Sequence, residues 1–250
     1  MSTTSFPLHT LTWGDGVRHI LLLHGISSSA AGWWRLAGDL AVSGWSVTAA
    51  DLRGHGHSPR ADDYSIPAYA ADVIALGDRW DAVLGHSLGG AVVVAAHRAA
   101  PNWARRLILQ DPALLLPDRA EVLPVLLEAF DRPLSAEVVA AANPAWHRED
   151  VRIKAEALRQ TGPDVVRGTV EDNDPWNLLA AAEAIEAPTL LLGSDPGRDG
   201  VVAVTLGEWL AGANPMVAYR MLAGAGHSAH REPAIYDRYL DVINRALGRE

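Results

Sequence analysis

Cysteine is absent from the 250-residue chain. Disulfides, thiolate metal sites and cysteine nucleophiles are therefore excluded together. Long hydrophobic runs are missing as well: no uninterrupted apolar stretch reaches the roughly 18 residues that a membrane span needs. No apolar run resembling a secretory signal precedes the first cation, Arg18. We therefore expect a cytoplasmic protein without a membrane partner.

Positive charge is also scarce. The 21 lysines and arginines are outnumbered by 30 acidic residues, so the formal net charge is −9, and Lys154 is the only lysine. Nucleic-acid binding relies on clustered cations that replace the counterions of the phosphate backbone, so the sequence predicts no nucleic-acid partner. The preference for arginine over lysine fits codon composition, and no function follows from it.

The remaining composition is that of an ordinary globular protein. Apolar residues make up 49% of the chain and charged residues 20%, and this length is enough for one α/β domain with a sizeable core. Short runs rich in Val, Ile and Leu alternate with longer helical patterns, which indicates βα units around a mostly parallel sheet. The predicted strands are 19–23, 46–50, 82–84, 107–110, 189–192 and 216–221.

Helical spacing recurs between these strands. The predicted helices are 30–42, 67–77, 88–99, 201–211 and 234–247. Between 112 and 186 the strand rhythm stops, and helix-like pieces interrupted by six prolines take its place. This stretch is too apolar to stay disordered. We expect a core formed by residues 1–111 and 187–250, with residues 112–186 inserted as a helical cap over the strand ends.

The strongest motif is Gly85-His86-Ser87-Leu88-Gly89, a G-x-S-x-G sequence between a predicted strand and a predicted helix. A serine at the apex of so sharp a turn needs unusual backbone angles, and glycines two residues away on each side remove side chains that would clash. The hydroxyl then projects from the sheet. We therefore expect Ser87 to be a nucleophile on a nucleophile elbow.

A second turn follows the strand that ends at Leu23. Its sequence, His24-Gly25-Ile26, places a backbone N–H close to the expected elbow. The N–H of Leu88 lies at the start of a helix, where amides are unpaired and the helix dipole is positive. The amides of Ile26 and Leu88 are therefore the candidate oxyanion hole.

A loop histidine follows the last predicted strand. His227 ends the sequence Gly224-Ala225-Gly226-His227, at the same edge of the sheet as Ser87. A histidine in this place can accept the serine proton and return it to the leaving group. The histidines show no H-E-x-x-H or comparable ligand spacing, so no metal site is expected.

The acid that orients His227 has three candidates. Asp111, Asp195 and Asp199 all lie at or just beyond predicted strand ends. Asp195 follows the strand at 189–192 almost directly, which suits a carboxylate fixed beside the loop that carries His227. We favour Asp195 and keep Asp111 and Asp199 as alternatives.

The segment from 51 to 58 closes another predicted strand with the sequence D-L-R-G-H-G-H-S. Its Asp51 and Arg53 are suited to bracing neighbouring loops through ion pairs. We expect this segment to serve structure rather than chemistry.

These motifs together resemble the α/β-hydrolase superfamily, in particular its small esterase-like and cofactor-free haloperoxidase-like members. The likeness covers almost the whole chain: the His24-Gly25 turn, the segment 51–56, the elbow 85–90, the strand 187–193 and the Gly226-His227 loop. It implies a mainly parallel sheet of about eight strands with the cap inserted after the sixth. It also implies the order Ser87, Asp195, His227 for the catalytic residues.

The expected activity is hydrolysis of an ester-like bond, in a carboxylester or a lactone, through an acyl-enzyme on Ser87. The partner is a small to medium apolar substrate, and no cofactor is implied. Leu114, Phe130, Trp146 and Trp176 offer apolar surface for substrate binding in the cap. Two alternatives remain: C–C bond hydrolysis or perhydrolysis by the same triad, and a ligand-binding receptor with weak turnover on the same fold.

Overall fold

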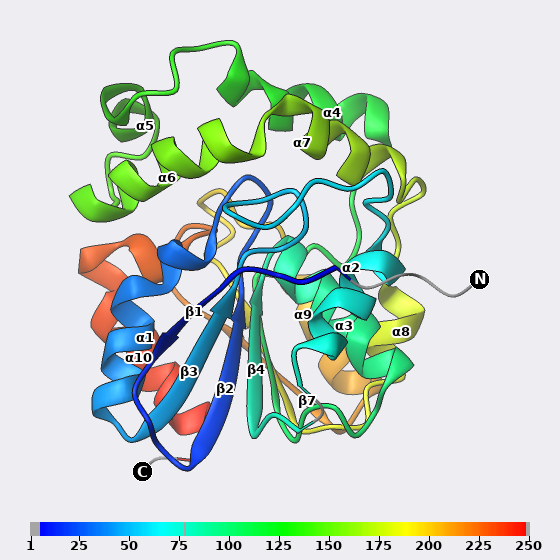
Figure 1. Ribbon diagram of the computed structural model, residues 1–250. Helices are drawn as coiled ribbons and strands as arrows, with labels where there is room; N and C mark the ends of the chain where they lie inside the picture. The colour runs from blue at the N-terminus through cyan, green and yellow to red at the C-terminus, as the bar shows by residue number, and fades with distance from the viewer. Residues whose placement is uncertain (1–5, 78, 249–250) are drawn as a thin grey trace.

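The computed structural model describes residues 6–77 and 79–248. Within them the chain forms one seven-stranded sheet with the strand order β1-β3-β2-β4-β5-β6-β7 (Figure 1). The strands are β1 (Thr10–Trp13), β2 (Arg18–Leu23), β3 (Trp45–Ala50), β4 (Ala82–His86), β5 (Leu107–Gln110), β6 (Thr189–Gly193) and β7 (Val217–Met221). Strand β1 is antiparallel to β3, and all other pairs are parallel.

The six predicted strands all occur, with shifts of a few residues at their ends. Sequence reasoning missed β1, a short strand at the edge of the sheet whose residues are mostly half-buried. The described residues contain seven strands instead of about eight, so the helical insertion follows the fifth strand of this sheet rather than the sixth. The mainly parallel α/β architecture is confirmed.

Alternating side chains on the strands pack into two separate clusters, one on each face of the sheet. In β2, Ile20 and Leu22 pack on the side of α1 (Trp34–Val42) and α10 (Pro233–Ala246). Leu21 and Leu23 pack on the opposite side. That side is covered by α2 (Ile66–Ala75), α3 (Leu88–Ala99) and α9 (Val204–Ala213). Both faces are therefore buried, which explains the continuous apolar runs.

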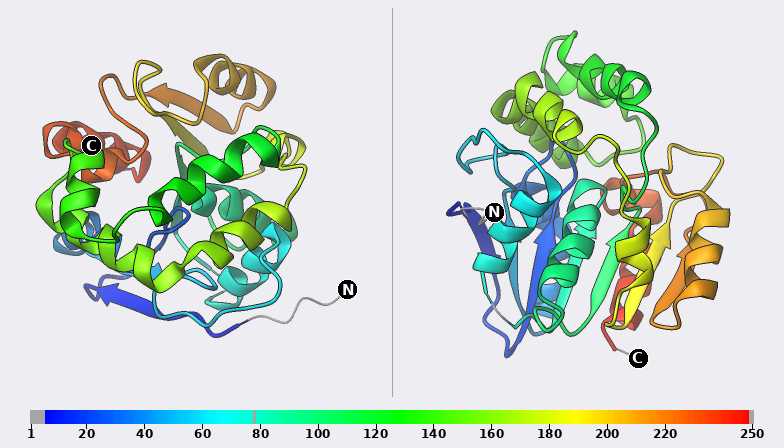
Figure 2. Two further views of the ribbon diagram at one scale, coloured as in Figure 1. Left: turned by 90° about the horizontal axis from the view of Figure 1, so that it is seen from above. Right: turned by 90° about the vertical axis from the view of Figure 1, so that its right-hand side faces the viewer.

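The segment between β5 and β6 is helical. It holds α4 (Arg119–Leu127), the 3-10 helix η2 (Glu128–Phe130), α5 (Ala136–Ala142), α6 (Arg148–Thr161), α7 (Pro163–Glu171) and α8 (Leu179–Glu183). Helices α4 to α7 form a layer across the end of the sheet to which the parallel strands point (Figures 1 and 2). We call α4 to α7 the cap.

The cap has a small apolar cluster of its own, formed by Val139, Val151, Ala155 and Leu158. By contrast, Ala182 of α8 packs in the main core together with residues of α3. The last part of the insertion is therefore built into the core.

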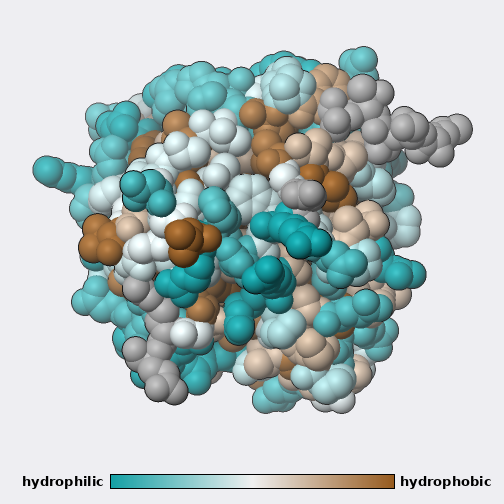
Figure 3. All heavy atoms as spheres, turned by 60° about the horizontal axis from the view of Figure 1, so that its bottom comes forward, coloured by the Kyte–Doolittle hydropathy of each residue, from teal (hydrophilic) through white to brown (hydrophobic). Residues whose placement is uncertain are grey.

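The opposite end of the molecule shows apolar residues scattered among polar ones (Figure 3). In the described part of the chain, no helix is both long and apolar enough to cross a membrane.

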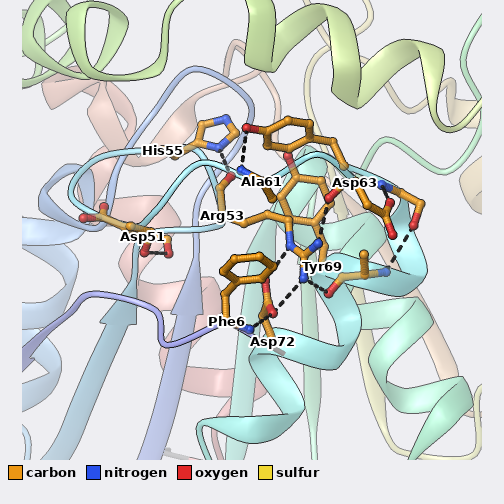
Figure 4. A network of polar contacts seen from close by, with 12 residues as sticks. Phe6, Asp51, Arg53, His55, Ala61, Asp63, Tyr69 and Asp72 are labelled. Atoms are coloured by element: carbon orange, nitrogen blue, oxygen red, sulfur yellow. Dashed lines mark hydrogen bonds and ion pairs between the residues drawn. The ribbon is translucent and has the colours of Figure 1, made fainter. Parts of the chain in front are cut away.

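The segment after β3 is braced by a buried ion pair, as the sequence predicts. Arg53 donates from Nε to Asp72 Oδ2 at 2.6 Å and from Nη2 to Asp72 Oδ1 at 2.8 Å (Figure 4). Both side chains are almost completely buried. Arg53 also donates to the carbonyl of Asp63, so one guanidinium ties this loop to α2 and to the segment before it.

Candidate active site

Ser87 lies at the turn between β4 and α3 in a strained conformation, with φ 53° and ψ −115°. The flanking glycines allow this turn. A Cβ atom on Gly85 would lie 2.3 Å from the carbonyl oxygen of Gly89, and one on Gly89 would lie 2.3 Å from that of Leu23. No side chain fits at either place, so the G-x-S-x-G sequence is a steric requirement of this turn.

The backbone of Ser87 is fixed on both sides by the segment after β5. Its N–H donates to the carbonyl of Gln110 at 3.1 Å, and its carbonyl accepts from the N–H of Ala113 at 3.1 Å. The side chain of Ser87 makes no hydrogen bond within the described residues, and the residue is 8% exposed. The backbone of Ser87 is thus held from both sides, while its hydroxyl is not tied to another side chain of the described residues.

His227 lies in the loop after β7 and is positioned through its backbone and its ring. Its N–H donates to Asp199 Oδ1 at 2.9 Å, and its carbonyl is 2.9 Å from Nε2 of His86. The rings of His86 and His227 lie 4.5 Å apart, centre to centre. Because His86 directly precedes Ser87, these contacts bring His227 beside the elbow.

The acid partner of His227 is Asp111. His227 Nδ1 lies 2.6 Å from Asp111 Oδ2. The same carboxylate accepts from the N–H of Val201 and from that of Val202, each at 2.9 Å. Because a carboxylate only accepts hydrogen bonds, the proton of the neutral imidazole is on Nδ1, which leaves Nε2 unprotonated.

The environment of Asp111 favours its charge although the residue is completely buried. Burial opposes ionisation, but the hydrogen bond and charge of His227 and the amides of Val201 and Val202 hold the pKa of Asp111 below its ordinary value. The backbone of Asp111 has a positive φ of 41°. A buried carboxylate held by three donors gives His227 a fixed orientation.

Asp195 does not contact the His227 ring, and the expectation that it does is wrong for this structure. Its Oδ2 accepts from the N–H of Gly224 at 2.6 Å and its Oδ1 from that of Gly197 at 2.8 Å. These two amides lower the pKa of the solvent-facing Asp195 carboxyl. Asp195 thus closes its own turn and ties it to the loop before His227.

The predicted oxyanion turn passes close to the elbow. A Cβ atom on Gly25 would lie 3.1 Å from the Cβ of Ser87. His24 is not part of the reactive face: its Nε2 accepts from the N–H of Leu52, and burial lowers its pKa to about 4. Ser27, two residues after Gly25, has a positive φ of 52°. The amides of Ile26 and Leu88 thus belong to segments that flank Ser87.

The four predicted substrate-binding residues separate into two groups instead of forming one wall. Leu114 is completely buried in the main core, and Trp176 packs there too, with its Nε1 donating to Ala113 at 2.7 Å. Phe130 and Trp146 pack against the apolar cluster of the cap. Leu114 and Trp176 therefore attach the insertion to the sheet.

Sequence reasoning missed the roles of His86 and Lys154. His86 is 5% exposed, and burial together with His227 and His230 keeps its pKa well below the ordinary value, so its ring is neutral. Its position inside the elbow motif was the available signal. Lys154 contacts Ser27 from the cap, and only its being the sole lysine set it apart in the sequence.

A family model described as the alpha/beta hydrolase fold matches residues 18–161, which is more than half of the chain. The chain belongs to this family. The resemblance inferred from the motifs is thereby confirmed, and this α/β hydrolase is an enzyme whose relatives are named hydrolases.

Two curated relatives illustrate the range of hydrolases to which the chain is similar. Lipase LipV from Mycobacterium tuberculosis is 36% identical over 147 residues, which are 56% of this chain and 56% of the lipase, so the chain spans about half the length of that relative. N-formylmaleamate deformylase from Pseudomonas putida is 27% identical over 239 residues, covering 91% of this chain and 88% of the deformylase. The names of these relatives differ in the bond that is cleaved.

Solved structures show the same fold. An N-formylmaleamic acid deformylase from Pseudomonas putida superimposes with a TM-score of 0.78 at 24% identity, covering 94% of this chain and 95% of that one. The enol-lactonase from Burkholderia xenovorans gives a TM-score of 0.80 at 21% identity, covering 97% and 96%. At such identities the likeness establishes architecture and leaves the substrate open.

Proposed function

We propose that this α/β hydrolase cleaves ester-like bonds, in carboxylesters or lactones, through an acyl-enzyme on Ser87. The observation that carries the proposal is the contact between the half-buried His227 ring and the buried Asp111, 2.6 Å apart, at the edge of the sheet where the strained elbow presents Ser87. An oriented imidazole beside a free serine hydroxyl is the arrangement that acyl transfer requires.

In the first half of the reaction, Ser87 Oγ forms a bond to the substrate carbonyl carbon while His227 Nε2 takes the hydroxyl proton. The leaving group then departs with that proton. In the second half, water attacks the acyl-enzyme and gives a proton to Nε2, and Ser87 Oγ regains it as the acid product leaves. Asp111 stabilises the imidazolium in both halves while remaining ionised.

The negative oxygen formed in each attack needs donors that are in place beforehand. We assign them to the amides of Ile26 and Leu88. Leu88 is the first residue of α3, whose leading amides lack partners within the helix. Ile26 follows Gly25, which passes directly beside Ser87. We further propose that the cap, within the inserted segment 112–186, limits access to this site.

The names of the relatives support acyl chemistry with more than one kind of leaving group. The relatives are named a lipase, an enol-lactonase and a deformylase, and hydrolysis of an ester, a lactone or a formamide transfers an acyl group from its leaving group to water. For this chain we propose a small to medium acyl substrate, because the cap covers the strand ends (Figure 2).

The decisive experiment replaces the nucleophile. Ser87→Ala is expected to lower kcat for para-nitrophenyl esters by about a thousandfold or more, with an unchanged melting temperature because the hydroxyl makes no hydrogen bond. A fluorophosphonate probe should label the wild type at one serine and leave Ser87→Ala unlabelled.

The matched control is Ser135→Ala, which removes a serine at the N-terminus of α5 in the cap. This variant should keep both ester turnover and labelling. Equal turnover by the wild type and Ser87→Ala would remove Ser87 from the mechanism. A wild type that neither turns over esters nor reacts with the probe would favour a ligand-binding role for the fold.

A further inference from the structure

Two positively charged side chains donate hydrogen bonds to the turn at Ser27 and Ser28, beside the proposed oxyanion hole. Lys154 of α6 donates from Nζ to the carbonyl of Ser27 at 2.8 Å and to its Oγ at 2.7 Å. Arg231, in the 3-10 helix η3 (Ala229–Arg231), donates from Nη2 to Ser28 Oγ at 2.6 Å and from Nε to His230 Nε2 at 3.1 Å. The cap and the core thus each direct a positive charge at the same turn.

Neither charge is neutralised by contact. All these acceptors are uncharged oxygens or an imidazole nitrogen, and neither cation forms an ion pair with another described residue. Arg231 is only 3% exposed. Buried charges in proteins are ordinarily paired, as Arg53 is with Asp72 in this same molecule. The Ser27–Ser28 turn is therefore a place of excess positive charge.

Two buried carboxylates lie in this region, and Asp51 accepts from the N–H of Ala30, two residues after Ser28, at 2.7 Å. Asp150 of α6 is 1% exposed, and one of its oxygens accepts from Nε1 of Trp34 at 3.3 Å. Its other oxygen has no hydrogen-bond partner. Burial raises the pKa of Asp150 to about 6, against the opposing attraction of Arg231. Asp150 thus attracts Arg231 across space without forming an ion pair with it.

The excess charge lies within reach of the reacting centre. A Cβ atom on Gly25 would lie 3.1 Å from the Cβ of Ser87, and Ser27 follows two residues later, a span of at most about 7 Å. Two of the three ammonium protons of Lys154 are directed at Ser27, which leaves the third as a donor. A substrate whose carbonyl is at Ser87 extends over this distance with a few bonds.

We propose that Lys154, supported by the field of Arg231, forms a subsite for a carboxylate carried by the substrate a few bonds from the scissile carbonyl. This inference rests on the proposed function and narrows its substrate class to acyl compounds with an anionic end. The substrate carboxylate accepts the third proton of the ammonium, and its negative charge offsets part of the positive charge of Lys154 and Arg231.

The charge of the subsite depends on pH in a defined direction. Burial and the charge of Arg231 lower the pKa of Lys154 to about 7. His24 and His55 face Lys154 from the loops after β2 and β3, and burial lowers their pKa values to about 4 and about 3, so both are neutral above that range. Asp150 titrates lower, near its raised pKa of about 6. The attraction for an anion therefore weakens as pH rises through about 7.

The test compares two para-nitrophenyl esters of equal acyl length, the hemiglutarate, which carries a carboxylate, and the neutral pentanoate. The measured quantity is the ratio of their kcat/KM values, in which the chemistry of Ser87 and His227 cancels. Lys154→Met is expected to lower this ratio by about tenfold or more. Lys154→Arg should retain most of it, because it keeps the charge.

The control is Arg152→Met on the same helix, whose side chain is exposed and paired with Glu149 at 2.7 Å. It should leave the ratio unchanged. A Lys154→Met variant that slows both esters equally would overturn the subsite and reduce Lys154 to a brace for the Ser27 turn. Loss of the proposed function appears differently, as failure of Ser87→Ala to slow either ester.

The wild type provides a second measurement that depends on no variant. Its preference for the hemiglutarate should decline as pH rises through about 7, because the free enzyme loses the Lys154 charge. The carboxylate of the ester stays ionised over this range, so the decline reports the protein. A ratio that is constant between about pH 6 and 9 would also overturn the proposal.

Discussion

The loops after β5 and β6 begin alike, but their aspartates make different contacts. Each follows a buried parallel strand, and each carries an aspartate within two residues of the strand end. Asp111 is completely buried and contacts His227 Nδ1, whereas Asp195 faces solvent and binds Gly197 and Gly224. A place at a strand end therefore does not decide which aspartate contacts the His227 ring.

The difference lies in the donors that surround each carboxylate. Asp111 collects amides from Val201 and Val202, which lie far away in the sequence, together with an imidazole from a third segment. Asp195 collects an amide of its own turn and one from the neighbouring loop. Only the first arrangement excludes water and directs a negative charge at His227. Substitutions of the three aspartates are therefore expected to differ in their effect on kcat.

Asp111→Asn should have the largest effect. An amide at this position cannot hold His227 in the tautomer with a free Nε2, so kcat is expected to fall by about three to four orders of magnitude. Steady-state ester hydrolysis measures the loss. The melting temperature should fall as well, because the amide group replaces a carboxylate that accepts three hydrogen bonds.

The effect of Asp111→Asn on catalysis can be measured separately from its effect on stability. Hydrolysis is measured at a temperature well below the new melting point, with circular dichroism confirming the fold. If Asp111→Asn then turns over esters within tenfold of the wild type, the acid has been misplaced, although the assignments of Ser87 and His227 would remain.

Asp199→Asn should have an intermediate effect. Its carboxylate accepts the N–H of His227 at 2.9 Å and so fixes the backbone of the loop, not the ring. We expect a loss in kcat of about tenfold or less, because a positioning contact is weakened while the charge pair with Asp111 persists. A loss that rivals Asp111→Asn would identify Asp199 as the acid.

Asp195→Asn should have the smallest effect. The amide oxygen can still accept from Gly224, and the site faces solvent, so kcat is expected to stay within about threefold of the wild type. The same hydrolysis assay provides the measurement. A severe loss here, with an active Asp111→Asn, would reverse the contrast between the two loops and restore the expectation drawn from the sequence.

Local signals were sufficient for much of this molecule. The Val-, Ile- and Leu-rich runs predicted six strands because parallel strands are buried on both faces. The G-x-S-x-G sequence predicted the elbow because glycines are the residues that fit beside Gly89 O and Leu23 O. Strand β1 was not predicted because it is short, lies at the edge of the sheet and is mostly half-buried, so its hydrophobic pattern is weak.

The sequence by itself therefore determined the α/β architecture, Ser87 at the elbow and His227 in a loop at the same edge, since each depends on residues close together in the chain. Only the tertiary structure decided that Asp111 is the partner of His227 and that Lys154 reaches Ser27. Both decisions join segments more than a hundred residues apart. In the sequence, each candidate aspartate lies at or just beyond a predicted strand end, so its neighbours along the chain do not separate it from the others. Only the folded chain distinguishes a buried carboxylate with three donors from one that faces water.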